Sequence, residues 1–134
     1  MNIKADGLQK ELKRLLEEYD IENYFTFDMS IPDTIGYINE NIKFYSRQSE
    51  YELTPAFYQE ASGIWLDAFT SNWYGAGLIY NHLNNNKKVA IVSPELHKRP
   101  HFQFWEYLKK EKIYQEENVI ICTDYPENAK AFFT

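Results

Sequence analysis

The chain has 134 residues, and its 14 basic and 20 acidic side chains give a formal charge of −6. This length suits one domain with a core of ordinary size, which we place at residues 1–134. The negative charge argues against nonspecific nucleic-acid binding, because a phosphate backbone recruits basic surfaces. It still allows a small phosphorylated ligand held by one or two local cations.

Two further observations concern the compartment. Cys122 is the only cysteine, so no internal disulfide can form and a reducing compartment is expected. The amino terminus lacks the apolar core of a signal peptide, and no apolar run approaches the roughly 20 residues that span a bilayer. We therefore expect a cytoplasmic protein with no membrane span and no nucleic-acid partner.

The first half of the chain predicts three strands, each followed by a helix. Short apolar or aromatic runs, typical of buried parallel strands, lie at residues 3–5, 24–29 and 42–46. Helical spacing of apolar side chains, or a capping residue followed by proline, predicts helices at residues 8–19, 30–38 and 56–61.

The second half repeats this alternation. Strands are predicted at residues 63–69, 89–92 and 119–122. Helices are predicted at residues 73–83, 102–108 and 126–133, although two glycines weaken the first of these.

The rhythm predicts an α/β fold with six βα units in a mostly parallel sheet, because the strands recur about every 20–30 residues. Closed (β/α)8 barrels have eight strands in roughly 200–250 residues. The chain is two strands short, so the sheet is either open or an incomplete TIM-type (β/α)8 barrel.

Each predicted strand ends at a group of polar residues. In parallel α/β proteins the carboxyl ends of the strands meet at one edge, where binding and catalysis take place. We therefore expect a substrate- or phosphate-binding site at that edge, formed by Lys4, Asp28, Arg47, Glu50, Trp65, Asp67 and Glu95. We assign no catalytic residue and no metal ligand.

Several of these residues also have a purely structural interpretation. Lys4 could be a surface lysine, and Arg47 could form an ion pair with Glu50 in place of a bidentate contact to phosphate. Asp28 could cap the next helix, although Ser30 competes for that role. These alternatives stay open at the level of sequence.

The same applies to the later strand ends. Trp65 and Asp67 share one face of their strand, where they could border a ligand, but Trp65 could equally pack in the core. Glu95 and His97 could serve acid–base chemistry, but loop placement is the simpler interpretation, and two ligands seldom make a metal site. The remaining histidines, His82 and His101, are expected at the surface.

The run Val119-Ile-Ile-Cys-Thr-Asp-Tyr-Pro126 resembles the closing strand of the glycerophosphodiester phosphodiesterase family. Residues 2–4 (NIK) resemble an earlier strand of that barrel. The segments FDMSIPD, YSRQSEYE, GIWLDAF and VAIVSPELH are similar to a bacterial branch of these barrels, which are related to phosphatidylinositol-specific phospholipase C. The resemblance covers nearly the whole chain and keeps its order.

The resemblance implies that the chain is the carboxyl-terminal portion of a phosphodiesterase barrel that lacks the first two strands. The family's His-Arg-Gly motif, Glu-x-Asp pair and second histidine belong to those two strands, and no predicted strand of this chain carries them. Lys4 matches the family lysine near the phosphate. A divalent cation such as Mg²⁺ or Ca²⁺ binds in some complete barrels, but Asn2 replaces the glutamate that helps to bind it.

Two functions follow as expectations. The first is a portion of a phosphoric diester hydrolase that has no substantial activity alone, because an in-line reaction needs a general acid and a general base. The second is a non-catalytic module that binds a phosphorylated ligand or a protein. Open sheet edges favour pairing with another chain, so we expect a homo-oligomer or a partner that supplies the missing strands.

Overall fold

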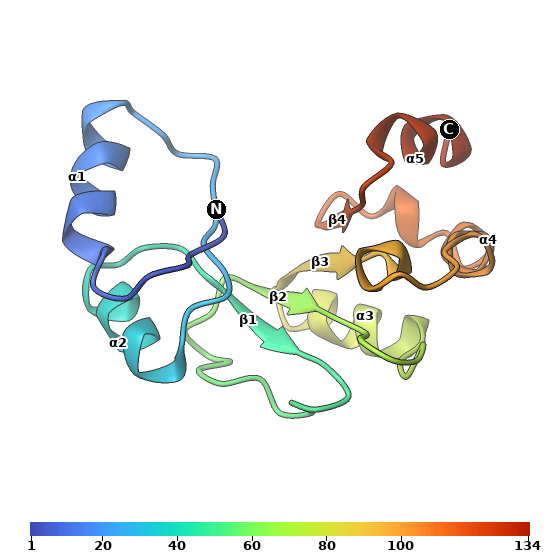
Figure 1. Ribbon diagram of the computed structural model, residues 1–134, viewed down its shortest axis with the longest axis horizontal. Coiled ribbons are helices and arrows are strands. Elements are labelled where there is room, and N and C mark those ends of the chain that lie inside the picture. Colours follow the sequence, from blue (N-terminus) through green and yellow to red (C-terminus); the bar gives the residue numbers. More distant parts are fainter.

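A computed structural model describes residues 1–134 and has a four-stranded parallel sheet at its centre (Figure 1). The strands lie side by side in chain order, and they are β1 (Tyr45–Gln48), β2 (Gly63–Leu66), β3 (Lys88–Val92) and β4 (Val119–Cys122). Each pairs in parallel with the next. The predicted α/β class is confirmed.

Five helices connect and flank these strands. They are α1 (Gln9–Glu18), α2 (Ile31–Asn39), α3 (Ala76–Asn84), α4 (Phe102–Lys110) and α5 (Pro126–Phe132). Short 3₁₀ turns follow β3 at Pro94–His97 and precede β4 at Ile113–Gln115. As predicted, Ser30 begins α2, because its side chain accepts a hydrogen bond from the Asp33 amide. None of the helices is long and apolar enough to cross a bilayer.

The two amino-terminal segments that were predicted as strands pair with the sheet only through isolated bridges. Asn2 pairs in parallel with Phe27, and Thr26 pairs in parallel with Phe44 just before β1. The backbone amide of Tyr45 donates to the Thr26 carbonyl at 2.8 Å. The sheet therefore has four regular strands, with two bridged segments added beyond β1.

The prediction of a helix at residues 56–61 is wrong, because this segment forms turns. Phe57 has a φ of 52°, in the left-handed region that interrupts an α-helix. The Ser46 hydroxyl also donates to the Ala56 carbonyl at 2.6 Å, which holds the turn against β1. The helix was predicted because a capping residue, Thr54, is followed by Pro55. This local signal did not produce a helix.

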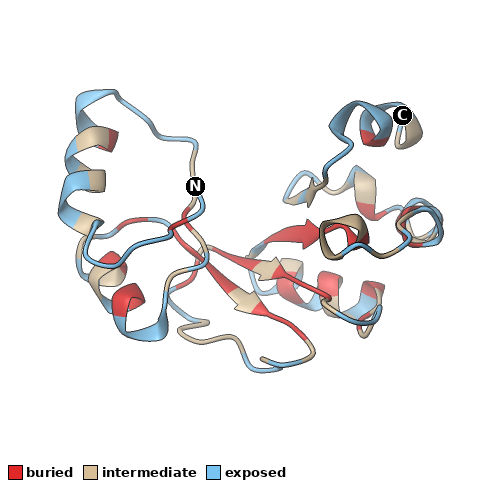
Figure 2. Ribbon diagram, in the orientation of Figure 1, coloured by how far each residue is buried: buried red, intermediate tan, exposed pale blue.

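The main hydrophobic core lies between one face of the sheet and the helices of the carboxyl-terminal half. Ile64 pairs with Val89, and Leu66 pairs with Ile91, so their side chains share one face of β2 and β3. All four are fully buried, together with residues of α3 and α4. Figure 2 shows buried residues gathered along β1 to β3. A smaller cluster joins α1 and α2 near the amino terminus.

The opposite face of the sheet carries a different set of side chains. In register across the sheet lie Arg47, Trp65, Ala90 and Ile120. The Phe27 ring stacks on Trp65 with 3.9 Å between centroids, so the bridged segment packs directly on this face. This face of the sheet therefore carries stacked aromatic rings and, toward the carboxyl ends of the strands, charged groups.

His82 was expected at the surface, and this expectation is wrong, because the side chain is buried on α3. Its Nε2 lies 2.7 Å from the Gln48 Oε1, and its Nδ1 lies 2.9 Å from the Tyr58 hydroxyl. These partners match a neutral imidazole that donates at Nε2 and accepts at Nδ1. The ring joins α3 to β1 and to the turn before β2.

We predict that protonation of His82 destabilises the fold. Burial lowers the pKa of His82 below its usual value of 6.5, so below that pH the unfolded chain takes up a proton that the folded chain excludes. The free energy of unfolding, measured by urea titration, should be lower at pH 5.5 than at pH 7.5. A His82→Gln variant should lose most of this difference, and an unchanged difference in the variant would contradict the prediction.

Candidate functional site

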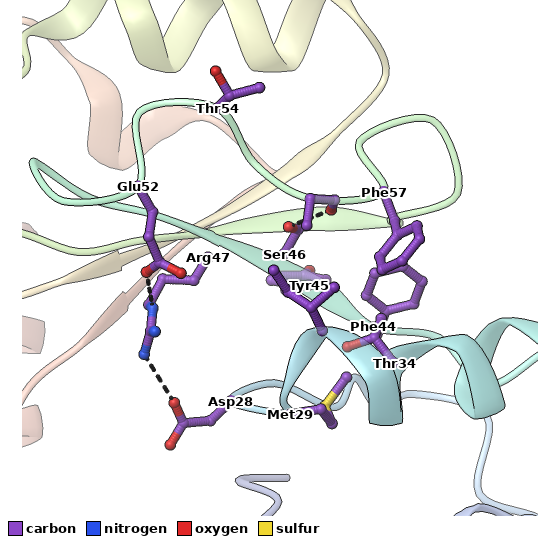
Figure 3. Close-up of a pocket in the computed structure, with 12 residues that line it drawn as sticks. Asp28, Met29, Thr34, Phe44, Tyr45, Ser46, Arg47, Glu52, Thr54 and Phe57 are labelled. Atoms are coloured by element: carbon purple, nitrogen blue, oxygen red, sulfur yellow. Dashed lines mark hydrogen bonds and ion pairs between the residues drawn. The ribbon is translucent and has the colours of Figure 1, made fainter.

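The carboxyl edge of the sheet carries a chain of four alternating charges. Lys4 Nζ contacts Asp28 Oδ2, and Arg47 Nη1 lies 3.2 Å from Asp28 Oδ1. Arg47 Nε in turn contacts a carboxylate oxygen of Glu52 (Figure 3). We call Lys4, Asp28, Arg47 and Glu52 the charge chain. It contains two cations and two anions, so its formal charge is zero.

A cavity of about 170 Å³ adjoins the charge chain. Figure 3 shows Asp28, Arg47 and Glu52 on one side of it, with Tyr45 and Phe57 on the other. The polar wall comes from strand ends and loops, whereas the apolar wall comes from rings. The cavity therefore offers charged contacts at one side and apolar contacts at the other.

The cations of the charge chain remain partly accessible to water. The Lys4 side chain is 71% exposed and the Arg47 side chain is 39% exposed, so their ion pairs contribute little to stability. The hydrogen bond from Arg47 to Glu52 raises the pKa of Arg47 further, which keeps the guanidinium charged. Both cations are thus available to a competing anion.

Glu50 was predicted as a binding residue. In the structure its side chain links two loops, the one that follows β1 and the one that follows β2, and we call these contacts the loop tie. Its carboxylate accepts hydrogen bonds from the Phe69 amide at 3.1 Å and from the Thr70 amide at 2.6 Å. The Thr70 hydroxyl adds a third bond at 2.9 Å. Although partial burial raises the pKa of Glu50, these bonds lower it to about 2. The alternative in which Glu50 pairs with Arg47 is wrong, because Arg47 pairs with Glu52.

Asp67 pairs with His97 at the ends of β2 and β3. Asp67 Oδ1 lies 2.7 Å from His97 Nε2 and also accepts the Ala68 amide at 2.8 Å. The Asp67 side chain is only 8% exposed, and the His97 ring packs against Phe69. The sequence pattern suggested a pair of His97 with Glu95 and did not predict this contact, although Asp67 lies near the end of one predicted strand and His97 follows the next.

Glu95 connects the ends of β3 and β4. Its carboxylate accepts hydrogen bonds from the Ser93 and Thr123 hydroxyls and from the Asp124 amide. Although burial raises the pKa of Glu95, these bonds lower it on balance. His101, expected simply at the surface, is half-buried with its Nδ1 3.9 Å from Glu95. Both carboxylate oxygens of Glu95 therefore accept hydrogen bonds within the protein.

Each of the two interpretations of Trp65, core packing and a place beside a ligand, agrees in part with the structure. Its ring is half-buried and stacks on Phe27, so it packs within the protein. It is also in register with Arg47 and shares the sheet face that leads to the charge chain. Of the seven predicted residues, the structure brings Lys4, Asp28 and Arg47 into one connected group.

Comparison with models of known families, with curated proteins and with solved structures found no match to this chain. The family resemblance therefore stays a prediction. No three histidine, cysteine or carboxylate side chains are placed to hold a metal ion together. What the arrangement itself can do chemically is to hold an anion between two cations and to transfer a proton at the Asp67–His97 pair.

We predict that Glu50 supports stability through its loop tie. Glu50→Gln removes the charge from an acceptor of three hydrogen bonds, so the free energy of unfolding should fall by about 1–3 kcal/mol. The exposed Glu60 provides a matched control, and Glu60→Gln should change stability by less than about 0.5 kcal/mol. Equal effects of the two substitutions in urea titrations would show that the tie is unimportant.

Proposed function

We propose that the carboxyl edge of this chain binds a small phosphorylated ligand through Arg47 and Lys4. The observation that carries this proposal is that two cations, distant in the sequence, meet on one carboxylate beside a cavity. An arginine fork and a lysine ammonium are the side chains that proteins use for phosphate oxygens. The position at the carboxyl ends of parallel strands supports the same function.

We further propose that the chain is the carboxyl-terminal portion of a phosphodiesterase-like (β/α)8 barrel. Its parallel strands and its two bridged segments follow one another in chain order, whereas a doubly wound sheet reverses direction at a switch point. The resemblance of residues 119–126 to the closing strand of the phosphodiesterase family favours the same assignment. The six segments are two fewer than the eight strands of a closed barrel.

On this proposal the chain alone does not hydrolyse a phosphodiester. In-line attack at phosphorus needs a base and an acid on opposite sides of the phosphate, in addition to cations that stabilise the equatorial oxygens. Lys4 and Arg47 provide the cations. No strand of this chain carries the family histidine and Glu-x-Asp motifs, which the resemblance associates with acid–base chemistry. The one Glu-x-Asp sequence, at residues 18–20, lies at the end of α1.

Isothermal titration with inorganic phosphate and with glycerol phosphate tests the binding function. Binding should weaken as salt is raised, because it depends on charge. Arg47→Gln should reduce the affinity by about tenfold or more, since a charge-assisted contact is lost. The exposed Lys10 of α1 serves as a control, and Lys10→Gln should leave the affinity unchanged. Binding that survives Arg47→Gln would refute the assignment.

A second candidate function, association with another chain, is favoured by β4. This strand pairs with β3 alone, and its Ile120 side chain is 46% exposed. An unpaired parallel edge with an apolar side chain is a site for strand addition. The phosphate-binding and association functions are compatible, because the first uses the strand ends and the second uses the outer edge.

We predict that the purified chain self-associates as its concentration is raised. Sedimentation velocity should show the weight-average mass increasing over the micromolar range. Ile120→Lys should shift this increase to higher concentration, because a charge on the edge strand opposes pairing. A single monomeric species at every concentration would remove association as a candidate function.

A further inference from the structure

The carboxylate of Asp28 occupies the space between the two cations of the charge chain. One oxygen contacts Lys4 Nζ, and the other lies 3.2 Å from Arg47 Nη1. Each oxygen therefore accepts from a different cation. Two oxygens of a phosphate group, joined through one central atom, present the same pattern of acceptors. A phosphate can make these contacts only if the carboxylate moves away.

Asp28 also lines two cavities. It lines the cavity of about 170 Å³ beside Arg47, and it lines a second cavity of about 280 Å³ beside Lys4. Figure 3 shows the Asp28 side chain directed toward Arg47 at the border of the first cavity. Movement of this one side chain would leave Arg47 at the first cavity and Lys4 at the second without the carboxylate that they share.

The backbone at this position suits aspartate, asparagine or glycine. Asp28 has a φ of 76°, in the left-handed region that these three residues adopt more readily than most. A carboxylate here is not needed for the turn itself. The Ser30 side chain, not that of Asp28, caps α2.

The contact is also open to exchange. The side chain of Lys4 is 71% exposed and that of Asp28 is 27% exposed, so water can replace either partner. Arg47 keeps Glu52 as a second carboxylate partner when Asp28 leaves. The guanidinium would therefore stay in place while its other side becomes free for a ligand.

We propose that Asp28 is an internal competitor that occupies the anion site and must move out before a phosphate group binds between Lys4 and Arg47. This inference rests on the proposed function, because it concerns the same site. It makes the carboxylate a determinant of affinity: the ligand must replace a covalently attached anion that is always present at the site.

Isothermal titration with inorganic phosphate at low ionic strength tests this inference on the full chain. Asp28→Asn and Asp28→Gly both remove the carboxylate, and both residues suit a positive φ, so the turn should be kept. Each variant should bind phosphate about tenfold more tightly than the unmodified chain, because no attached carboxylate then competes with phosphate for Lys4 and Arg47. Glu52→Gln is the matched control, since it removes a carboxylate from the same arginine without emptying the space between the cations.

The outcomes separate this inference from the function on which it rests. Tighter binding in both Asp28 variants, and less than about threefold tightening in Glu52→Gln, would support the inference. Phosphate binding that depends on Arg47 but does not tighten in the Asp28 variants would overturn the inference and leave the proposed function standing. Equal tightening in Glu52→Gln would reduce the effect to net charge and would also overturn it. No binding by any of these proteins would overturn both.

Discussion

The parallel pairing of successive segments in chain order is the constraint on which the rest of the structure depends. Each connection returns the chain to start the next strand in the same direction, so all carboxyl ends collect at one edge of the sheet. This is why Lys4, Asp28 and Arg47, which are far apart in the sequence, lie in one charge chain. The same order leaves β4 paired on one side only.

The carboxyl edge combines two kinds of carboxylate. Glu50 and Glu95 have their oxygens bound by amides and hydroxyls of neighbouring loops, and these bonds connect the ends of adjacent strands. Asp28 and Glu52 instead face the Arg47 guanidinium. The first kind gives the edge a fixed shape, whereas the second kind balances the cations that a phosphate would need. On the proposed function, an anion that binds at this edge must compete with these carboxylates, in a chain whose formal charge is already −6.

The sequence correctly predicted those strands and helix starts whose formation depends mainly on neighbouring residues in the chain. The continuous apolar runs at 89–92 and 119–122 correspond to β3 and β4, and Ser30 begins α2 as its capping chemistry requires. The runs at 3–5 and 24–29 became bridged segments, because strand length depends on pairing with distant residues. The placement of the candidate site at the strand ends followed from topology. The partners within it did not: Arg47 contacts Glu52, not Glu50, and His97 contacts Asp67, because side-chain pairing across strands has no local signature.

A two-dimensional NMR titration of the isotope-labelled chain with inorganic phosphate would locate the anion site residue by residue. We expect backbone amide shifts to change at residues 4, 28, 47 and 52 and in the turns beside them, with one common affinity. The amides of α4 and α5, which lie at the other end of the sheet in Figure 1, should stay unchanged. Shift changes centred on residues 97–101, or none up to tens of millimolar phosphate, would contradict the claim that the charge chain is the anion site.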